Sequence, residues 1–300
     1  MFGQSLLSAF GSAACTTDTD QLFATDVQTT SVATYQLNNA TTSIPSNTYP
    51  GTASNITYAA GKFGNAAVFN GSSSYVALPT GQFNYSNFTI SSWVYPTSAP
   101  TVRGSILTTY MYTAGPSKGY VFGINNNMTV HFSCYYDDSG NRITADTTQT
   151  VPLNQWTQLS LSFSTVDSKV IFYINGVAVK TTTFSGNVLR YETNNNTSIG
   201  VLKYSNSNVE QYFVGKIDQL RIFNSALPQA AVTALYNETT TTATYPYVDY
   251  VNANPNSIAY YKMSDATDQF GNYNGTASNV NFNTVGKFGF AGAFNGLQNS

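Results

Sequence analysis

The chain repeats part of itself, and the repeat sets the size of its folding unit. Four segments from the N-terminal third return near the C-terminus in the same order. They are residues 33–41, 51–56, 61–64 and 68–71, which return as 259–267, 275–280, 286–289 and 293–296. The separation is 226 residues for the first pair, 224 for the second and 225 for the last two. One domain therefore has roughly this length, and a second copy begins before Ser300.

This repeat predicts four parts. Residues 1–30 form an N-terminal anchor or assembly segment, and residues 31–238 form the first domain. Residues 239–257 are a linker rich in Thr, Pro and Asn, a composition that favours extended chain. Residues 258–300 are the beginning of a second, incomplete copy of the domain.

The first domain has the patterns of an all-β fold. Segments 88–95, 119–124, 128–135, 156–163 and 169–174 are rich in β-branched and aromatic residues that alternate with polar ones. Asn175-Gly176 between two such runs predicts a tight hairpin, because both residues tolerate positive φ. Residues 227–236 predict one short helix with Pro228 at its start.

The composition excludes several classes of function. Only 9% of the residues are charged and the net charge is −2, so the positive field that nucleic-acid binding needs is missing. No window reaches the 18 apolar residues of a membrane-spanning helix. Cys15 and Cys134 are the two cysteines, and we expect both to be unpaired.

An ordered set of motifs carries a family resemblance. It comprises residues 61–71 (GKFGNAAVFNG), 88–96 (FTISSWVYP), 155–159 (QWTQL), 172–176 (FYING), 213–223 (FVGKIDQLRIF) and the closing 226–236. In this order they resemble the laminin G-like domain of the concanavalin A-like lectin and glucanase superfamily. The resemblance implies an antiparallel two-sheet jelly-roll sandwich, often with a calcium ion and a face that binds carbohydrate or protein.

The tandem arrangement, the low charge and the short leader resemble appendage proteins of marine bacteriophages. This resemblance implies a non-enzymatic virion protein, a tail or head fibre or a decoration, that displays lectin-like domains to glycans on the host surface. Two alternatives remain open. One is a secreted bacterial adhesin or accessory carbohydrate-binding module, and the other is a purely architectural capsid decoration without a ligand.

The leader has features of an assembly anchor. Phe2, Leu6, Leu7 and Phe10 recur at nearly helical spacing and form an apolar stripe that nothing else in the leader covers. We expect this stripe to pack against virion proteins or other copies of the chain. By analogy with phage fibres, the copies would form a homotrimer.

The sequence lacks the residues of a glycosidase. Retaining and inverting glycosidases need two facing carboxylates, and the related glucanases carry them as Glu-x-Asp-x-x-Glu on one strand. Here glutamate occurs only at positions 192, 210 and 238, and Asp137-Asp138 is typical of a turn. His131, the one histidine, lies in an expected strand, where a structural role is the usual one. We therefore expect no enzymatic activity.

Asp218 is the carboxylate with an unusual setting. It alternates in step with Leu220 and Ile222, which would turn it toward the core. A buried carboxylate must be paired, hydrogen-bonded or metal-bound. The resemblance implies calcium, held by Asp218 together with Asn70 and Gly71, and oxygen ligands suit that ion. The alternative is that backbone amides cap Asp218 without a metal.

Tyrosines near the expected loops are the candidates for ligand binding, because a phenol ring can stack on a sugar and also form a hydrogen bond. They are Tyr110, Tyr112, Tyr135, Tyr136 and Tyr204. Trp93 and Trp156 stand where the family keeps a strand tryptophan, so we assign both to the core.

Overall fold

The computed structural model describes residues 31–43, 48–111, 117–136, 141–185, 189–191, 193–204 and 208–238, and in the C-terminal part residues 266, 273–278, 280–285 and 290–294. The anchor predicted at residues 1–30 lies outside the described residues. The chain divides into two compact units, residues 1–242 and 243–300, which are taken in turn below.

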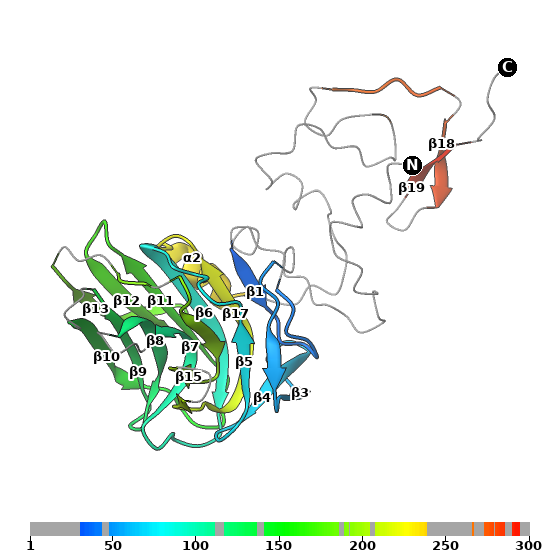
Figure 1. The fold of residues 1–300 in the computed structure, drawn as a ribbon. Coiled ribbons are helices and arrows are strands. Elements are labelled where there is room, and N and C mark those ends of the chain that lie inside the picture. Colours follow the sequence, from blue (N-terminus) through cyan, green and yellow to red (C-terminus); the bar gives the residue numbers. More distant parts are fainter. Residues whose placement is uncertain are drawn as a thin grey trace. The chain divides into compact units, whose positions relative to one another are not determined.

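The first unit is built mainly from two antiparallel sheets that stack face to face (Figure 1). In its described part, sheet A has eight strands in the order β13-β12-β11-β6-β17-β4-β3, with β1 paired to β17. These strands are β1 Ala33–Tyr35, β3 Thr57–Ala60, β4 Asn65–Asn70, β6 Asn87–Pro96, β11 Thr157–Ser164, β12 Lys169–Ile174, β13 Val177–Thr183 and β17 Val214–Phe223.

Sheet B has seven strands among the described residues, in the order β10-β9-β8-β7-β14-β5-β2. They are β2 Thr52–Ser54, β5 Tyr75–Leu78, β7 Arg103–Met111, β8 Lys118–Asn125, β9 Thr129–Tyr135, β10 Arg142–Thr150 and β14 Asn196–Ile199. Two further short strands, β15 Leu202–Lys203 and β16 Val209–Glu210, pair only with each other. We call them, with residues 201, 204, 208 and 211, the β15–β16 arm. The predicted antiparallel jelly-roll sandwich is confirmed.

The core lies between the two sheets, because each strand turns its alternate apolar side chains inward. Phe88 from β6 stacks on Tyr120 from β8 with ring centroids 4.9 Å apart, and on its neighbour Phe163 at 5.2 Å. Phe122 and Phe132 are also fully buried. Each such side chain contributes about 1.5–3 kcal/mol to folding.

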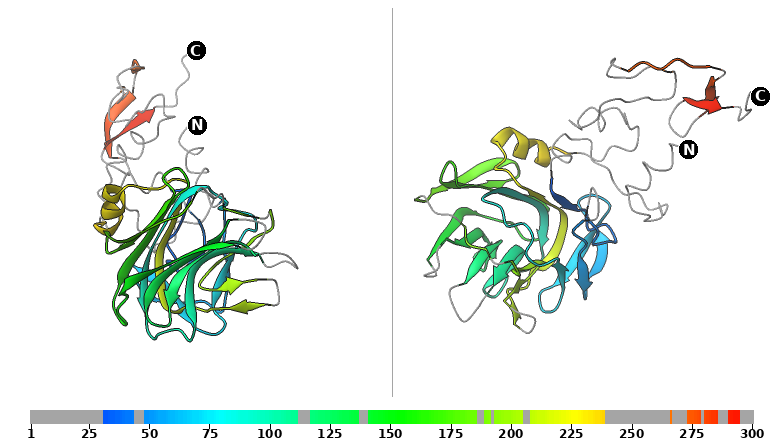
Figure 2. Two further views of the ribbon diagram at one scale, coloured as in Figure 1. Left: turned by 90° about the vertical axis from the view of Figure 1, so that its left-hand side faces the viewer. Right: turned by 45° about the horizontal axis from the view of Figure 1, so that its top comes forward.

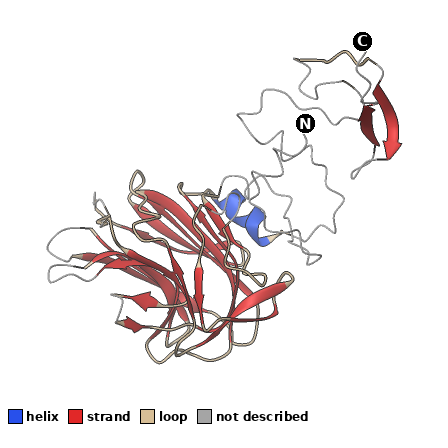
Figure 3. Ribbon diagram, turned by 45° about the vertical axis from the view of Figure 1, so that its right-hand side comes forward, coloured by secondary structure: helices blue, strands red, loops and turns tan. Residues whose placement is uncertain are grey.

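Two local predictions, the hairpin turn and the short helix, are confirmed. Asn175 and Gly176 have φ values of 51° and 73°, as the tight turn between β12 and β13 requires. Helix α2, Gln229–Tyr236, follows Pro228 and buries Val232 and Leu235 (Figure 3). Among the described residues, no helix combines the length and the apolar character needed to cross a bilayer.

The second unit contains a hairpin formed by β18 Val280–Val285 and β19 Phe290–Phe294 (Figure 2). Its register repeats that of β3 and β4. Val285 pairs with Phe290 as Ala60 pairs with Asn65, and Asn281 pairs with Ala293 as Thr57 pairs with Val68.

Between these pairs β18 has one residue more than β3, and the register shifts there. The change of repeat spacing from 224 to 225 residues is therefore a β-bulge.

Candidate functional site

Three of the predicted tyrosines converge on the outer face of sheet B. Tyr110 lies on β7, Tyr135 ends β9, and Tyr204 follows β15. The hydroxyls of Tyr110 and Tyr135 are 3.3 Å apart, and the rings of Tyr110 and Tyr204 meet edge to face with centroids 5.1 Å apart. Together with Val121 and Leu202 these rings form an apolar cluster separate from the core. We call the three side chains the tyrosine cluster.

Alternation along the strands explains why the cluster faces outward. On β8, Tyr120 and Phe122 belong to the core, so Val121 between them points away from it. Tyr110 pairs across the sheet with Gly119, whose missing side chain lets the phenols of β7 and β9 meet over β8. Gly119 has φ of 93°, and a Cβ there would lie 1.9 Å from the carbonyl oxygen of Thr109, so only glycine fits.

The β15–β16 arm borders the cluster on the β7 side. Thr108 donates its hydroxyl to the carbonyl of Val201 (3.1 Å), and the amide of Ser105 donates to the carbonyl of Gln211 (2.9 Å). Tyr204 donates its hydroxyl to the Glu210 carboxylate. Burial, followed by that carboxylate, raises the pKa of Tyr204, so its phenol remains a hydrogen-bond donor.

Tyr135 has a different environment. Burial alone would raise its pKa, but hydrogen bonds with Tyr110, Ser117 and Arg142 outweigh burial and lower the pKa. Arg142 is exposed on the neighbouring strand β10 and pairs across the sheet with Tyr135. The cluster therefore presents aromatic edges, phenol oxygens and a guanidinium on one surface.

A hydrogen-bonded chain of side chains runs along the same face. His131 Nδ1 is 2.7 Å from Asp146 Oδ1, and His131 Nε2 is 3.1 Å from Ser133 Oγ. Asn125 Nδ2 donates to the same Oδ1 at 2.7 Å. Burial, and then the nearby Arg103, lower the pKa of His131 to about 4. The imidazole is therefore neutral at pH 7, with its proton on Nδ1 toward the carboxylate and Nε2 accepting from Ser133.

Ser133, His131 and Asp146 have the connectivity of an acyl-transfer triad, but they lack its other half. Such a triad needs N–H donors aimed at the developing oxyanion. The backbone of Ser133 is paired on both sides, with Val121 and with Thr144. The backbone of Ser133 thus lies within the sheet, and its own N–H does not form an oxyanion hole. What the arrangement does achieve is to fix the Asp146 carboxylate.

The Asp218 carboxylate lies on the outer face of sheet A, and the prediction that it faces the core is wrong. The pairing of β17 with β6 shifts between Asp218 and Arg221, where Gln219 has φ of 49°. This bulge lets Ile217 and Leu220 both face the core, while Asp218 pairs with Trp93 on the opposite face.

Asp218 is fully buried, and its Oδ2 accepts backbone N–H bonds from Lys62 (2.9 Å) and Phe63 (3.0 Å). Burial raises its pKa to about 7, although those hydrogen bonds oppose the shift. Trp93 is buried there as predicted, in a second hydrophobic cluster with Phe63, and Trp156 is only partly buried against that cluster.

The described residues do not fit a calcium ion shared by Asp218, Asn70 and Gly71. Asn70 pairs with Val214, four residues from Asp218 along β17, a separation of roughly 13 Å. The side-chain oxygen Oδ1 of Asn70 already accepts the backbone N–H groups of Ser72, Ser73 and Ser74. Asp218 Oδ2 accepts two backbone N–H donors, whose partial positive charges would repel a cation.

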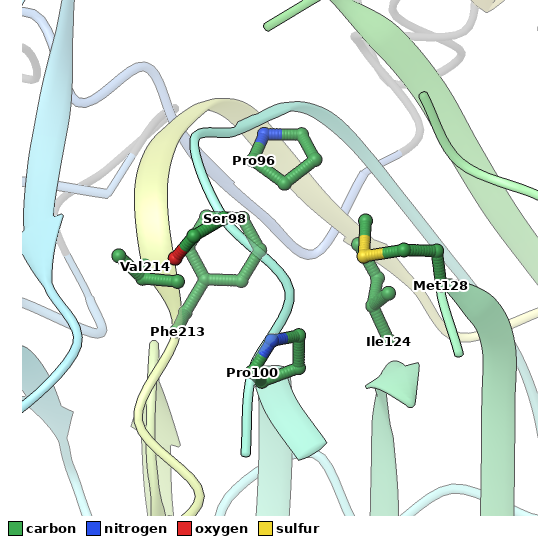
Figure 4. A pocket seen from close by; sticks show the side chains of 8 residues that line it. Pro96, Ser98, Pro100, Ile124, Met128, Phe213 and Val214 are labelled. Carbon is green, nitrogen blue, oxygen red and sulfur yellow. The ribbon is translucent and has the colours of Figure 1, made fainter. Parts of the chain in front are cut away.

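Of the remaining predicted tyrosines, the one that the structure describes, Tyr136, is not part of the cluster. Tyr136 packs against the main core, and Tyr112 lies outside the described residues. A small pocket at one end of the sandwich, lined by Pro96, Phe213 and Met128 among others, has a volume of about 10 Å³ (Figure 4). That space holds at most a single water molecule. This pocket is therefore too small to hold a sugar ligand.

Comparison with known proteins agrees with this fold. A family model described as the concanavalin A-like lectin/glucanases superfamily matches residues 70–233. The chain belongs to this superfamily. No curated protein sequence matches the chain significantly.

Among solved structures, domain 4 of AbnA, an extracellular GH43 arabinanase from Geobacillus stearothermophilus, was determined in complex with arabinotriose. It is 27% identical with a TM-score of 0.54, and the match covers 68% of this chain and 97% of that domain. The binding domain of Paraclostridial Mosquitocidal Protein 1 is 14% identical with a TM-score of 0.56, covering 70% of this chain and 52% of that one. The botulinum neurotoxin serotype G binding domain is 15% identical with a TM-score of 0.51, covering 69% and 50%. The last two show the shared superfamily fold alone.

The sequence analysis did not predict the hydrogen-bonded side chains of His131, Asp146 and Asn125. The signal was the alternation of Arg142, Thr144 and Asp146, which lie exposed between buried Ile143 and Ala145. That pattern marks one polar face of a strand, but the partner strand is known only once the register is known.

Proposed function

We propose that residues 31–238 form a non-catalytic carbohydrate-binding domain whose ligand lies against the tyrosine cluster on the outer face of sheet B. The observation that carries the proposal is the convergence of Tyr110, Tyr135 and Tyr204, from three separate segments, beside the exposed Arg142. Sugar rings present apolar C–H faces and a rim of hydroxyls. Aromatic rings with polar handles match both features.

The relatives support this reading. Domain 4 of AbnA, which was solved with arabinotriose, is 27% identical to this chain, and the match covers nearly the whole of that domain. The low charge of this chain also suits a neutral oligosaccharide better than a polyanion.

The experiment is a glycan array that includes arabinotriose, followed by calorimetric titration of each glycan that binds. Tyr135→Ala and Tyr204→Ala should each weaken binding about tenfold or more, because they remove a stacking ring and a hydrogen bond. Tyr75→Ala is the matched control, a half-buried tyrosine on β5 outside the cluster. No binding by the wild-type protein, or equal losses for all three variants, would contradict the proposal.

We propose further that the domain is displayed in tandem on a bacteriophage particle and binds glycans of the host surface. The matching registers of β3–β4 and β18–β19 support the tandem arrangement. Deleting residues 1–30 should abolish incorporation into particles and leave glycan binding intact. Secretion of the full chain as a free adhesin, or incorporation without any glycan binding, would favour the two alternative settings.

A further inference from the structure

Among the described residues, the carboxylate of Asp146 is held by hydrogen bonds to only one of its two oxygens. Its side chain is 45% exposed. Oδ1 accepts two hydrogen bonds of 2.7 Å, one from His131 and one from Asn125. Oδ2 makes no hydrogen bond with the residues that the structure describes. The inward oxygen Oδ1 is therefore occupied, and the outward oxygen Oδ2 can accept a hydrogen bond from a ligand.

A surface carboxylate does not need such support for its own sake. An exposed Asp is solvated by water, and isolated surface interactions of this kind add little stability. Here His131 is buried and neutral and receives a further hydrogen bond from Ser133, so three side chains hold one carboxylate in a single orientation. Fixing a group before binding removes the entropy cost of ordering it at the moment of binding. The arrangement is that of a preorganised hydrogen-bond acceptor.

The position of Asp146 relates it to the tyrosine cluster. Asp146 pairs with His131 and Arg142 pairs with Tyr135, so the two pairs occupy the same outer face four residues apart. At about 3.4 Å per residue, that separation is roughly 13 Å along β10. Exposed Thr144 lies between them. A ligand that contacts both ends must therefore be longer than one sugar ring.

We propose that Asp146 determines specificity in this site. Its outward Oδ2 accepts a hydrogen bond from a hydroxyl of a neutral oligosaccharide that extends along β10 from the tyrosine cluster, and His131 is a positioning residue for that carboxylate. This inference rests on the proposed function and adds the direction, the minimum length and the charge class of the ligand. An acidic sugar would be repelled at the Asp146 end.

Asp146→Asn isolates the outward atom. The Asn side-chain oxygen can keep the hydrogen bonds from His131 and Asn125, which places an NH₂ donor where Oδ2 stood. Asp167→Asn is the matched control, because Asp167 is a similarly exposed aspartate (53%) in the turn between β11 and β12 and loses the same charge. Both variants are measured on the same array, which carries arabinose, arabinotriose and further neutral and acidic oligosaccharides.

The expected result is that Asp146→Asn weakens binding of neutral oligosaccharides about tenfold or more. The difference in affinity between neutral and acidic oligosaccharides should also become smaller. Asp167→Asn should bind like the wild type. Single sugars should bind too weakly for Asp146 to matter. His131→Leu should mimic Asp146→Asn, and His131→Asn should restore much of the affinity, since its amide can donate where Nδ1 did.

The outcomes separate the two proposals. If tyrosine variants lose binding while Asp146→Asn and His131→Leu keep it, the inference on Asp146 is overturned and the proposed function stands. If the wild type binds no glycan, both are overturned. Thermal unfolding of each variant identifies a loss of binding caused by misfolding, and an unfolded His131→Leu leaves Asp146→Asn as the deciding variant.

Discussion

Each sheet of the sandwich carries a buried titratable side chain on its outer face, and the two are treated in opposite ways. Asp218 on sheet A is closed in by backbone N–H groups and an aromatic cluster. His131 on sheet B begins a chain of side chains that ends at the exposed Asp146. The Asp218 carboxylate accepts nearby backbone N–H groups through Oδ2, whereas the His131 imidazole is connected by hydrogen bonds to a carboxylate that reaches solvent. The first arrangement serves stability, and the second can serve binding.

The largest expected effect is on stability at the closed site. Asp218→Ala leaves the N–H groups of Lys62 and Phe63 without their acceptor in a dry environment, which should cost about 2–4 kcal/mol. Urea unfolding at pH 6 measures this loss, with Asp167→Ala as the exposed control. A loss equal to that of the control would mean that Asp218 does not lock the turn at residues 61–63.

The second effect is the pH dependence of that lock. The pKa of Asp218 is raised to about 7, so the folded state binds its proton more tightly than the unfolded state does. Its ionisation should therefore lower stability as pH rises from about 4 to about 7. Asp218→Asn, which resembles the protonated acid, should match the wild type below about pH 4, and its advantage should grow to about 3–4 kcal/mol by pH 8. A constant difference between the two proteins across this range would contradict the shift.

His131 should show the opposite sign and a smaller effect. Its pKa is depressed to about 4, so the unfolded state binds the proton more tightly, and stability falls as pH drops from about 6.5 to about 4. His131→Leu should remove this acid sensitivity and cost about 1 kcal/mol at pH 7, because Ser133 and Asp146 reach other partners or water. Denaturation midpoints at pH 5 and 7 give both quantities. If the substitution leaves the acid sensitivity unchanged, groups other than His131 are its cause.

The smallest effect on stability is expected at Asp146, the exposed end of the hydrogen-bonded series of side chains that begins at His131. Asp146→Asn should change the free energy of unfolding by less than about 0.5 kcal/mol, since the side chain is partly exposed and its inward hydrogen bonds are kept. A loss above about 1 kcal/mol in the same urea experiment would place Asp146 with Asp218 as a structural group. The comparison between the two faces would then fail.

Much of the fold could be predicted from local signals, because alternation and turn chemistry are local properties. Residues 88–95 and 169–174 form β6 and β12, and Asn175-Gly176 forms the predicted hairpin turn between β12 and β13. The burial of Asp218 was also predictable, but its face was not. The bulge at Gln219 reverses the alternation, and glutamine gives no warning of a positive φ as glycine would.

The candidate site was only half predictable for a related reason. Aromatic side chains near loops can be recognised one at a time, which is how Tyr110, Tyr135 and Tyr204 were found. The contact between His131 and Asp146 depends on which strands are neighbours and in what register. Those are properties of the whole sheet, and no short segment contains them.

The bulge in β18 has a consequence for how such repeats can diverge. An inserted residue in a strand normally reverses every later position, so that an entire strand is read out of phase. Here pairing resumes at Thr284 and Ala291 in the phase that Ala59 and Ala66 have in the first copy, and the insertion is confined to a single step. A gene built from tandem copies can thus gain a codon at this point without a compensating deletion. Each copy is free to drift in length while its hairpin remains in phase.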